Sequence, residues 1–201
     1  MIKLVIFDIG GVLVDFMETQ YIEYLHENVL PEVDDRDLER FIMPLIELME
    51  YGMLTVPELE HMVAKHFKAN DLDLHWVKGW KKIAKPKNDV IDLLNAVSEK
   101  YRTALLSNVS RSRFAELRAG YLKLINVDKM YTSYQLRMRK PGPMIYEYVL
   151  KEEDVKPKEA VFVDNQIENV LGAEKVGIKA VWFRDYQRLL YDLEKFKITP
   201  L

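Results

Sequence analysis

The chain contains no cysteine, which excludes disulfide bonds, thiol nucleophiles and zinc–thiolate sites. No apolar run is long enough to span a bilayer. The first expected strand begins at the second residue, so there is no room for a signal peptide ahead of it. From these absences we expect a cytoplasmic protein that has no membrane partner.

A strong excess of charge of either sign is also missing. The 29 Lys and Arg residues nearly balance the 32 Asp and Glu residues, giving a net charge of −3. Nucleic-acid-binding domains usually present a strongly basic face, so we expect no nucleic-acid partner. Apolar residues make up 49% and charged residues 30% of the 201 residues. These values are typical of a globular protein with one domain, or one domain and a smaller insert.

The most informative stretch lies at the start of the chain. Leu4 to Phe7 is a short apolar run, which is typical of a strand buried on both faces. The run ends at Asp8, and Gly10 and Gly11 follow it closely, allowing the backbone to turn sharply and approach a ligand. Ligands of open α/β sheets bind beyond the carboxyl ends of the strands, so Asp8 is a candidate catalytic residue.

After Asp15 the apolar period becomes helical and stays so for about 70 residues, far more than a simple strand crossover needs. Pro44 predicts a kink or break in one helix, and Thr55 to Glu58 predict a capping box. We therefore expect residues 16–85 to form a helical cap domain over the end of the first strand, with 1–15 and 86–201 as the core domain. The expected helices span 18–30, 37–51, 56–67 and 74–83.

From residue 88 onward, helical and strand patterns alternate regularly. This alternation predicts the α/β class, a doubly wound, Rossmann-like parallel sheet with helices on both faces. The expected strands span 103–106, 130–133, 160–163 and 180–183, and the expected helices span 89–100, 110–124, 144–151, 170–176 and 186–196.

Four polar side chains are expected at one edge of this sheet. Ser107 and Asp164 follow apolar strands directly, as Asp8 does, and Lys140 follows one less directly. Phosphoryl transfer needs a positioned nucleophile and neutralisation of the phosphoryl charge. Asp8 can attack phosphorus to form an aspartyl-phosphate, and Lys140 can supply positive charge. The Ser107 hydroxyl and the backbone N–H of Asn108 can hold phosphoryl oxygens.

The same segments resemble the haloacid dehalogenase superfamily. FDIGGVLVD (7–15) resembles its first motif, LLSNVS (105–110) its second, Lys140 its third, and FVDNQIENVLGA (162–173) its fourth. Most members are magnesium-dependent phosphatases with an aspartate nucleophile, and many have a helical cap after the first strand. The resemblance therefore implies a HAD-like hydrolase that acts on a small phosphorylated metabolite with Mg²⁺ as cofactor.

The expected Mg²⁺ ligands are oxygen atoms, because this ion prefers them and keeps several waters. Asp8 and Asp164 can share the ion, and the backbone carbonyl of Gly10 is a further candidate. The fourth motif of the superfamily usually begins with two aspartates, whereas here Asn165 follows Asp164, which weakens the site. Glu168 is a possible replacement, and the sequence leaves open which of the last three residues binds the ion directly.

A second departure concerns the general acid and base. Superfamily phosphatases usually carry an aspartate two residues after the nucleophile, where this chain has Gly10. Such a group contributes about 10²–10⁴-fold to the rate. We therefore expect alkyl phosphates to be poor substrates, and acyl, aryl or anomeric phosphates to be better ones. We also expect the aspartyl-phosphate to accumulate. Asp15 is a candidate substitute acid, or else a turn or helix-capping residue.

Two other functions remain open. A metal-free haloacid dehalogenase would use the same Asp8, and LLSNVS suits that branch, although Asp8-Ile-Gly-Gly and Asp164 argue against it. Gly10 together with Asn165 also fits a non-catalytic homologue that binds phosphate or a metabolite. The substrate and the oligomeric state cannot be read from the sequence. Cap contacts are expected from 15–20 and 43–55, and four aromatic residues could line the pocket or pack in the cap: Phe16, Tyr21, Tyr51 and Trp76.

Overall fold

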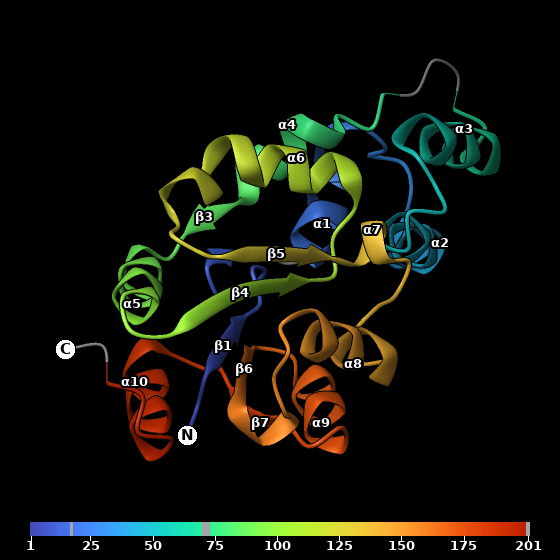
Figure 1. The fold of residues 1–201 in the computed structure, drawn as a ribbon. Helices are drawn as coiled ribbons and strands as arrows, with labels where there is room; N and C mark the ends of the chain where they lie inside the picture. Colours follow the sequence, from blue (N-terminus) through green and yellow to red (C-terminus); the bar gives the residue numbers. More distant parts are fainter. Residues whose placement is uncertain (17, 70–72, 200–201) are drawn as a thin grey trace.

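The computed structural model describes residues 1–16, 18–69 and 73–199. Its centre is a five-stranded parallel sheet in the order β5-β4-β1-β6-β7 (Figure 1). The strands are β1 (Leu4–Phe7), β4 (Arg102–Ser107), β5 (Lys129–Thr132), β6 (Ala160–Asp164) and β7 (Lys179–Trp182). The predicted doubly wound α/β class is confirmed, and the N-terminal strand occupies the middle of the sheet.

The register of the three central strands decides where their carboxyl ends lie. Phe7 of β1 is aligned with Leu105 of β4 on one side and with Val163 of β6 on the other. The next residue, Asp8, continues the ladder by donating its backbone N–H to the carbonyl of Val163 at 2.9 Å. The polar residues that end β4 and β6 therefore flank Asp8.

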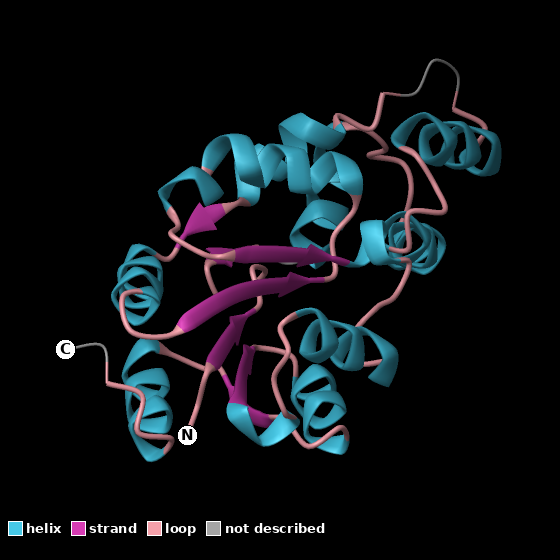
Figure 2. Ribbon diagram, in the orientation of Figure 1, coloured by secondary structure: helices cyan, strands magenta, loops and turns pink. Residues whose placement is uncertain are grey.

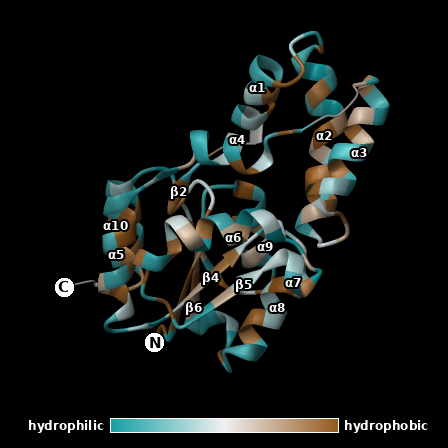
Figure 3. Cartoon of the chain, turned by 90° about the horizontal axis from the view of Figure 1, so that it is seen from above, coloured by the Kyte–Doolittle hydropathy of each residue, from teal (hydrophilic) through white to brown (hydrophobic). Residues whose placement is uncertain are grey.

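Helices cover both faces of the sheet (Figures 1 and 2). Successive residues of β1 alternate between two buried apolar clusters, because side chains of a strand point alternately to opposite faces. Hydrophobic colours accordingly concentrate on interior strands such as β4 and β6 (Figure 3). One face packs against α5 (Asn88–Ser98), α6 (Arg111–Gly120) and α10 (Tyr186–Lys195), and the other against α8 (Pro143–Glu152) and α9 (Ile167–Lys175).

Along the chain, four further helices come between β1 and β4. They are α1 (Glu18–Asn28), α2 (Asp35–Glu50), α3 (Val56–Phe67) and α4 (Trp76–Ile83). They share a third apolar cluster of their own, in which the ring of Tyr21 stacks on Trp80 at 4.7 Å and meets Trp76 edge-on at 5.0 Å. Tyr21 and Trp76 thus pack within this helical part. The division into core and cap domains stays a prediction.

The local sequence signals within the helical part have mixed outcomes. The backbone N–H and the hydroxyl of Thr55 both donate to Glu58 Oε2, at 2.8 and 2.6 Å, as a capping box requires. Pro44 does not break α2, which runs through it. The sequence did not predict the two-residue strands β2 (Val14–Asp15) and β3 (Lys85–Pro86), which pair antiparallel where the chain enters and leaves the helical part.

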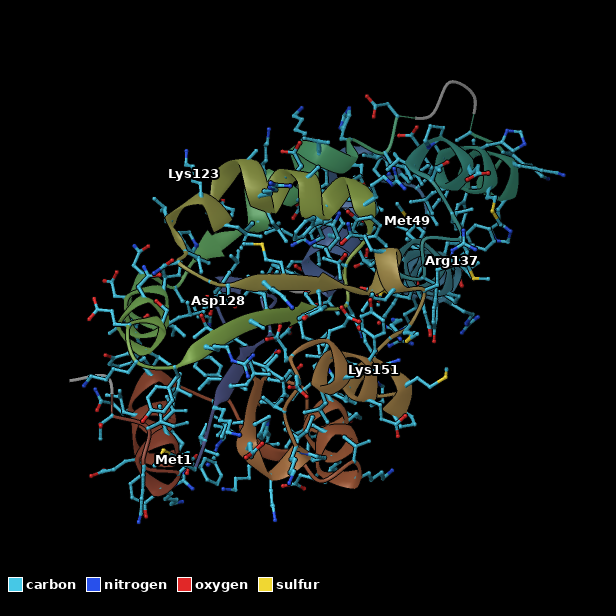
Figure 4. All side chains as sticks on the ribbon, viewed as in Figure 1. Met1, Met49, Lys123, Asp128, Arg137 and Lys151 are labelled. Carbon is cyan, nitrogen blue, oxygen red and sulfur yellow. The ribbon has the colours of Figure 1, made fainter. Side chains whose placement is uncertain are left out.

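The helical part contacts the core beside the end of the sheet. The strand expected over 130–133 ends at Thr132, and a short helix, α7 (Ser133–Leu136), follows it and packs against α2. Met49 of α2 and Arg137, just after α7, lie near each other in Figure 4. A Cβ on Gly52 would lie 2.6 Å from the carbonyl oxygen of Tyr134, so only glycine allows this approach.

The remaining differences are small. The helix expected over 110–124 ends at Gly120 and is followed by the 3₁₀ turn η1 (Leu122–Leu124), and a second turn, η2 (Pro157–Glu159), precedes β6. Among the helices of the described residues, none combines the length and apolar character that a membrane crossing requires.

Candidate active site

Lys140 lies between two carboxylates at the edge of the sheet. Its Nζ donates to Asp164 Oδ2 at 2.6 Å and lies 2.9 Å from Asp8 Oδ1 as an ion pair. A third contact, to the carbonyl oxygen of Leu106 at 2.9 Å, ties it to β4. All three charged side chains are buried. The structure therefore brings together the residues that were expected to converge from separate strand ends.

Burial and charge act in opposite directions on this group. Burial raises the pKa of Asp8, the Lys140 ammonium lowers it, and the Asp164 carboxylate raises it, to a net value of about 7. Burial alone would lower the pKa of Lys140, but the carboxylates of Asp164 and Asp8 outweigh this effect and raise it above its usual value. Lys140 therefore stays charged at neutral pH, and the charge on Asp8 is easily changed by its surroundings.

The backbone of Lys140 is fixed by Asn108. The Asn108 carboxamide donates to the Lys140 carbonyl oxygen and accepts from the Lys140 N–H, both at 2.9 Å. The sequence predicted only a backbone role for Asn108. It did not predict these two hydrogen bonds, which join the loop after β4 to the loop before α8. Ser107 is the last residue of β4 and lies buried beside them.

Asp164 is held by residues of the α9 start. Its Oδ1 accepts from the N–H of Gln166 at 2.8 Å, and both oxygens accept from Asn169 Nδ2, at 3.2 and 3.1 Å. Glu168, a candidate ligand from the sequence, is exposed, whereas Asn169 is buried and contacts Asp164. The cause is helical phase: α9 begins at Ile167, and successive helix residues are rotated by about 100°.

Among the described residues, Asn165 Oδ1 is a buried oxygen atom with no hydrogen-bond partner, and Asp8 Oδ1 is paired with the Lys140 ammonium at 2.9 Å. Asn165 lies against Gly11, whose φ is +73° and whose missing Cβ would collide with the carboxamide. Such oxygens are the donors a hard divalent cation takes. The described residues include no cluster of three or more His, Cys, Asp or Glu side chains, so the donor set must include amide or backbone oxygens.

The site opens into a cavity of about 570 Å³, which is within the range of small-ligand pockets. Core and helical part both contribute to its wall. From the core come Asp8, Gly10, Ser107, Asn108, Arg139, Lys140, Asn165, Gln166 and Asn169, and from the segment 16–85 come Phe16, Thr19, Met43, Pro44, Ile46, Glu47 and Glu50.

Phe16 covers the position where the expected acid is missing. A Cβ on Gly10 would lie 2.7 Å from Cζ of Phe16. The guanidinium of Arg113 stacks on the same ring at 3.5 Å and on Trp80 at 3.4 Å, which fixes Phe16 between the core and α4. Asp15 is exposed, forms an ion pair with Lys87 at 3.6 Å and does not line the cavity, so the geometry gives no support to it as the substitute acid.

Arg139 joins the far wall of the cavity to the loop that carries Lys140. Its Nε donates to Glu50 Oε2 at 2.6 Å, and its Nη1 donates to Glu47 Oε1 at 3.1 Å. The side chain of Glu50 is 10% exposed and that of Glu47 is 50% exposed. Sequence analysis expected contacts from 43–55 but did not single out these residues, because their pairing links positions about ninety residues apart.

Comparisons with known proteins agree with this arrangement. The D-ribitol-5-phosphate phosphatase of Bacteroides thetaiotaomicron is 26% identical over 189 residues, covering 89% of this chain and 90% of the relative. A haloacid dehalogenase family enzyme from the same organism, crystallised with magnesium and inorganic phosphate, has a TM-score of 0.79 at 24% identity, covering 94% and 99% of the two chains. The 2-haloacid dehalogenase of Pseudomonas syringae has a TM-score of 0.64 at 15% identity, covering 98% and 100%.

A family model is decisive among these matches. The model of haloacid dehalogenase-like hydrolases matches residues 2–177, which include all of the site residues named above and every strand of the main sheet except β7. The resemblance carried by the four motifs is confirmed. The chain belongs to the haloacid dehalogenase-like hydrolase family.

Proposed function

We propose that this protein is a magnesium-dependent phosphatase that hydrolyses a small phosphorylated metabolite through an aspartyl-phosphate on Asp8. The observation that carries the proposal is the buried Asp8–Lys140–Asp164 group at the base of a ligand-sized cavity. Two relatives named as phosphatases support it: the D-ribitol-5-phosphate phosphatase, and the glyceraldehyde 3-phosphate phosphatase of Pyrococcus furiosus, which is 40% identical over 58 residues.

Each core residue has a defined task in this proposal. Asp8 attacks phosphorus, and the alcohol or acid leaves with the bonding electrons. Lys140 neutralises charge on the phosphoryl oxygens and orients Asp8 through the ion pair. The Ser107 hydroxyl and the Asn108 N–H bind the remaining oxygens. Water then attacks phosphorus, which regenerates the Asp8 carboxylate and releases phosphate.

The residues present fit a magnesium ion. Asp8, Asp164, the Gly10 carbonyl and Asn165 would hold it. The unpartnered Oδ1 of Asn165 favours that residue over the exposed Glu168. Both oxygens of Asp164 already accept hydrogen bonds, from Lys140, Gln166 and Asn169, so Asp164 would exchange one of these contacts for the ion. When bound, the ion stabilises negative charge on the phosphoryl group and screens it from the attacking carboxylate.

The helices of residues 16–85 act as the cap in this proposal. They bring Phe16, Glu47 and Glu50 to the cavity that holds the core residues. A cap that closes over the substrate excludes water and sets specificity.

Assays with p-nitrophenyl phosphate and acetyl phosphate, each with Mg²⁺ or EDTA, test the proposal. We expect turnover only with Mg²⁺, and none in Asp8→Asn. Chloride release from a haloacid in EDTA would instead identify the metal-free dehalogenase. Binding of inorganic phosphate without turnover of any substrate would identify the second candidate, a non-catalytic binding protein, which the ring of Phe16 over Gly10 favours.

A further inference from the structure

We propose that the substrate is an aldose 1-phosphate, in which the phosphate is joined to the anomeric oxygen of a sugar. The inference rests on the proposed phosphatase function and adds the class of leaving group. Two features of the cavity carry it: the absence of an acid where the leaving oxygen departs, and a hydrogen-bonding array on the opposite wall.

The first feature restricts the leaving group to one that departs without a proton. Gly10 has no side chain that could protonate the leaving oxygen, and Phe16 fills the space above it. Beyond Asp8 and Lys140, the titratable groups lining the cavity are Glu47, Glu50 and Arg139. The two glutamates are engaged by the guanidinium as hydrogen-bond acceptors, and a guanidinium does not give up a proton at neutral pH.

Leaving groups of this kind fall into three classes: acyl, aryl and anomeric. An anomeric hydroxyl is more acidic than a primary or secondary alcohol, because the ring oxygen on the same carbon withdraws electrons. The phosphorus–oxygen bond therefore breaks more readily at that position than at any other hydroxyl of the same sugar.

The second feature selects among the three classes. Glu47 and Glu50 are one helical turn apart on α2, so both side chains face the cavity, and Arg139 bridges them. Carboxylates accept hydrogen bonds from hydroxyls and the guanidinium donates them, which matches a chain of neighbouring hydroxyl groups. Aryl and simple acyl groups offer no such partners.

The net charge of this wall restricts the leaving group further. Two carboxylates and one guanidinium leave one net negative charge on this wall, and a second phosphate or a carboxylate on the substrate would be repelled by it. Arg139, which binds hydroxyls in this proposal, directly precedes Lys140, which binds the phosphate. The Cα atoms of two adjacent residues are about 3.8 Å apart, so the two binding regions adjoin each other. A compact, neutral, hydroxyl-rich leaving group meets both ends at once.

The first test compares pairs of substrates that differ only in the position of the phosphate. We would measure kcat/KM with Mg²⁺ for D-glucose 1- and 6-phosphate and for D-ribose 1- and 5-phosphate. We expect the 1-phosphate to be favoured in at least one pair by on the order of 10²-fold, the contribution of a general acid that only the other isomer needs. Equal rates, or a preference for the terminal phosphate in both pairs, would overturn the inference.

Turnover of p-nitrophenyl phosphate distinguishes a wrong substrate class from a wrong phosphatase assignment. If it is hydrolysed while neither 1-phosphate is favoured, the phosphatase function stands and the substrate class fails. If neither it nor any sugar phosphate is hydrolysed, the phosphatase function itself fails.

The second test uses a matched pair of variants on α2. Glu47→Gln should lower the ratio of kcat/KM for the favoured 1-phosphate to that for p-nitrophenyl phosphate by about tenfold, the effect of one hydrogen bond to a charged group. Glu39→Gln makes the same change at an exposed position of the same helix outside the cavity and should leave the ratio at its wild-type value. An unchanged ratio in Glu47→Gln would overturn the role of this wall.

Discussion

The ring of Phe16 occupies the space above Gly10: a Cβ on that glycine would lie 2.7 Å from Phe16 Cζ. The guanidinium of Arg113 stacks on the same ring at 3.5 Å. The absence of an acid at position 10 is therefore matched by a second residue elsewhere in the chain. Restoring the acid requires that both positions change.

Gly10→Asp alone should not improve hydrolysis of alkyl phosphates, and it should lower the free energy of unfolding by about 1–3 kcal/mol through overpacking against Phe16. Gly10→Asp combined with Phe16→Ala should raise kcat for D-glucose 6-phosphate by ten-fold or more, on the order expected for a general acid. Phe16→Ala alone is the control. A gain in the single Gly10→Asp variant would show that the ring does not block the position.

Release of the leaving group should show a burst. Since Gly10 supplies no base to activate water, the second step should be slower than the first, and aspartyl-phosphate should accumulate. Rapid mixing with p-nitrophenyl phosphate should give close to one equivalent of p-nitrophenol per active site before the linear phase. A progress curve that is linear from the first turnover, with no phosphorylated protein after acid quench, contradicts this expectation.

Lys140→Met should unfold more easily than the wild type and should lose activity. Removing the ammonium leaves Asp8 and Asp164 buried without their partner, and breaking such a group costs about 3–5 kcal/mol. Urea denaturation and a phosphatase assay with Mg²⁺ measure the two effects. Lys123→Met, at an exposed position (Figure 4), is the matched control and should stay within about 0.5 kcal/mol of the wild type.

The raised pKa of Asp8 predicts how stability depends on pH in EDTA. The folded-state pKa of about 7 lies above the ordinary value of 3.8, so the folded protein holds the proton more tightly than the unfolded chain does. Stability from this group is full below pH 4 and is lost as the pH rises to 7, by up to about 4 kcal/mol.

Urea denaturation of wild type and Asp8→Asn at pH 4 to 8 isolates this contribution. The stability difference between the two proteins should move against the wild type as the pH rises through 7. Mg²⁺ should reduce the change, because it favours the ionised carboxylate. A difference that is independent of pH in EDTA would contradict the prediction.

The sequence predicted the sheet well because each central strand is a dense apolar run that ends in a polar residue. Parallel pairing then places Asp8, Ser107 and Asp164 at one edge whatever the helices do. The two-residue strands β2 and β3 were missed because so short a segment has no measurable period.

The rest of the cavity wall depends on contacts that a local pattern does not contain. The sequence left open whether Asp164, Asn165 or Glu168 would bind the ion and gave no role to Asn169, which the start of α9 at Ile167 turns toward Asp164. The pairing of Arg139 with α2 and the packing of Phe16 on Gly10 arise only when the helical part docks on the core. The aromatic type of Phe16 marked it as a residue that could line the pocket, as it does, but gave no signal for its contact with Gly10.

The pairing of β2 with β3 has a mechanical consequence. The chain's outgoing and returning segments are paired side by side, from Val14 to Pro86, so a swing of the helices beyond them would have to bend both segments together, at one pivot. Such a swing would draw Glu47 and Glu50 away from Arg139 and admit a sugar phosphate. Asp8 and Lys140 are anchored on the sheet side of that pivot and would stay in place throughout.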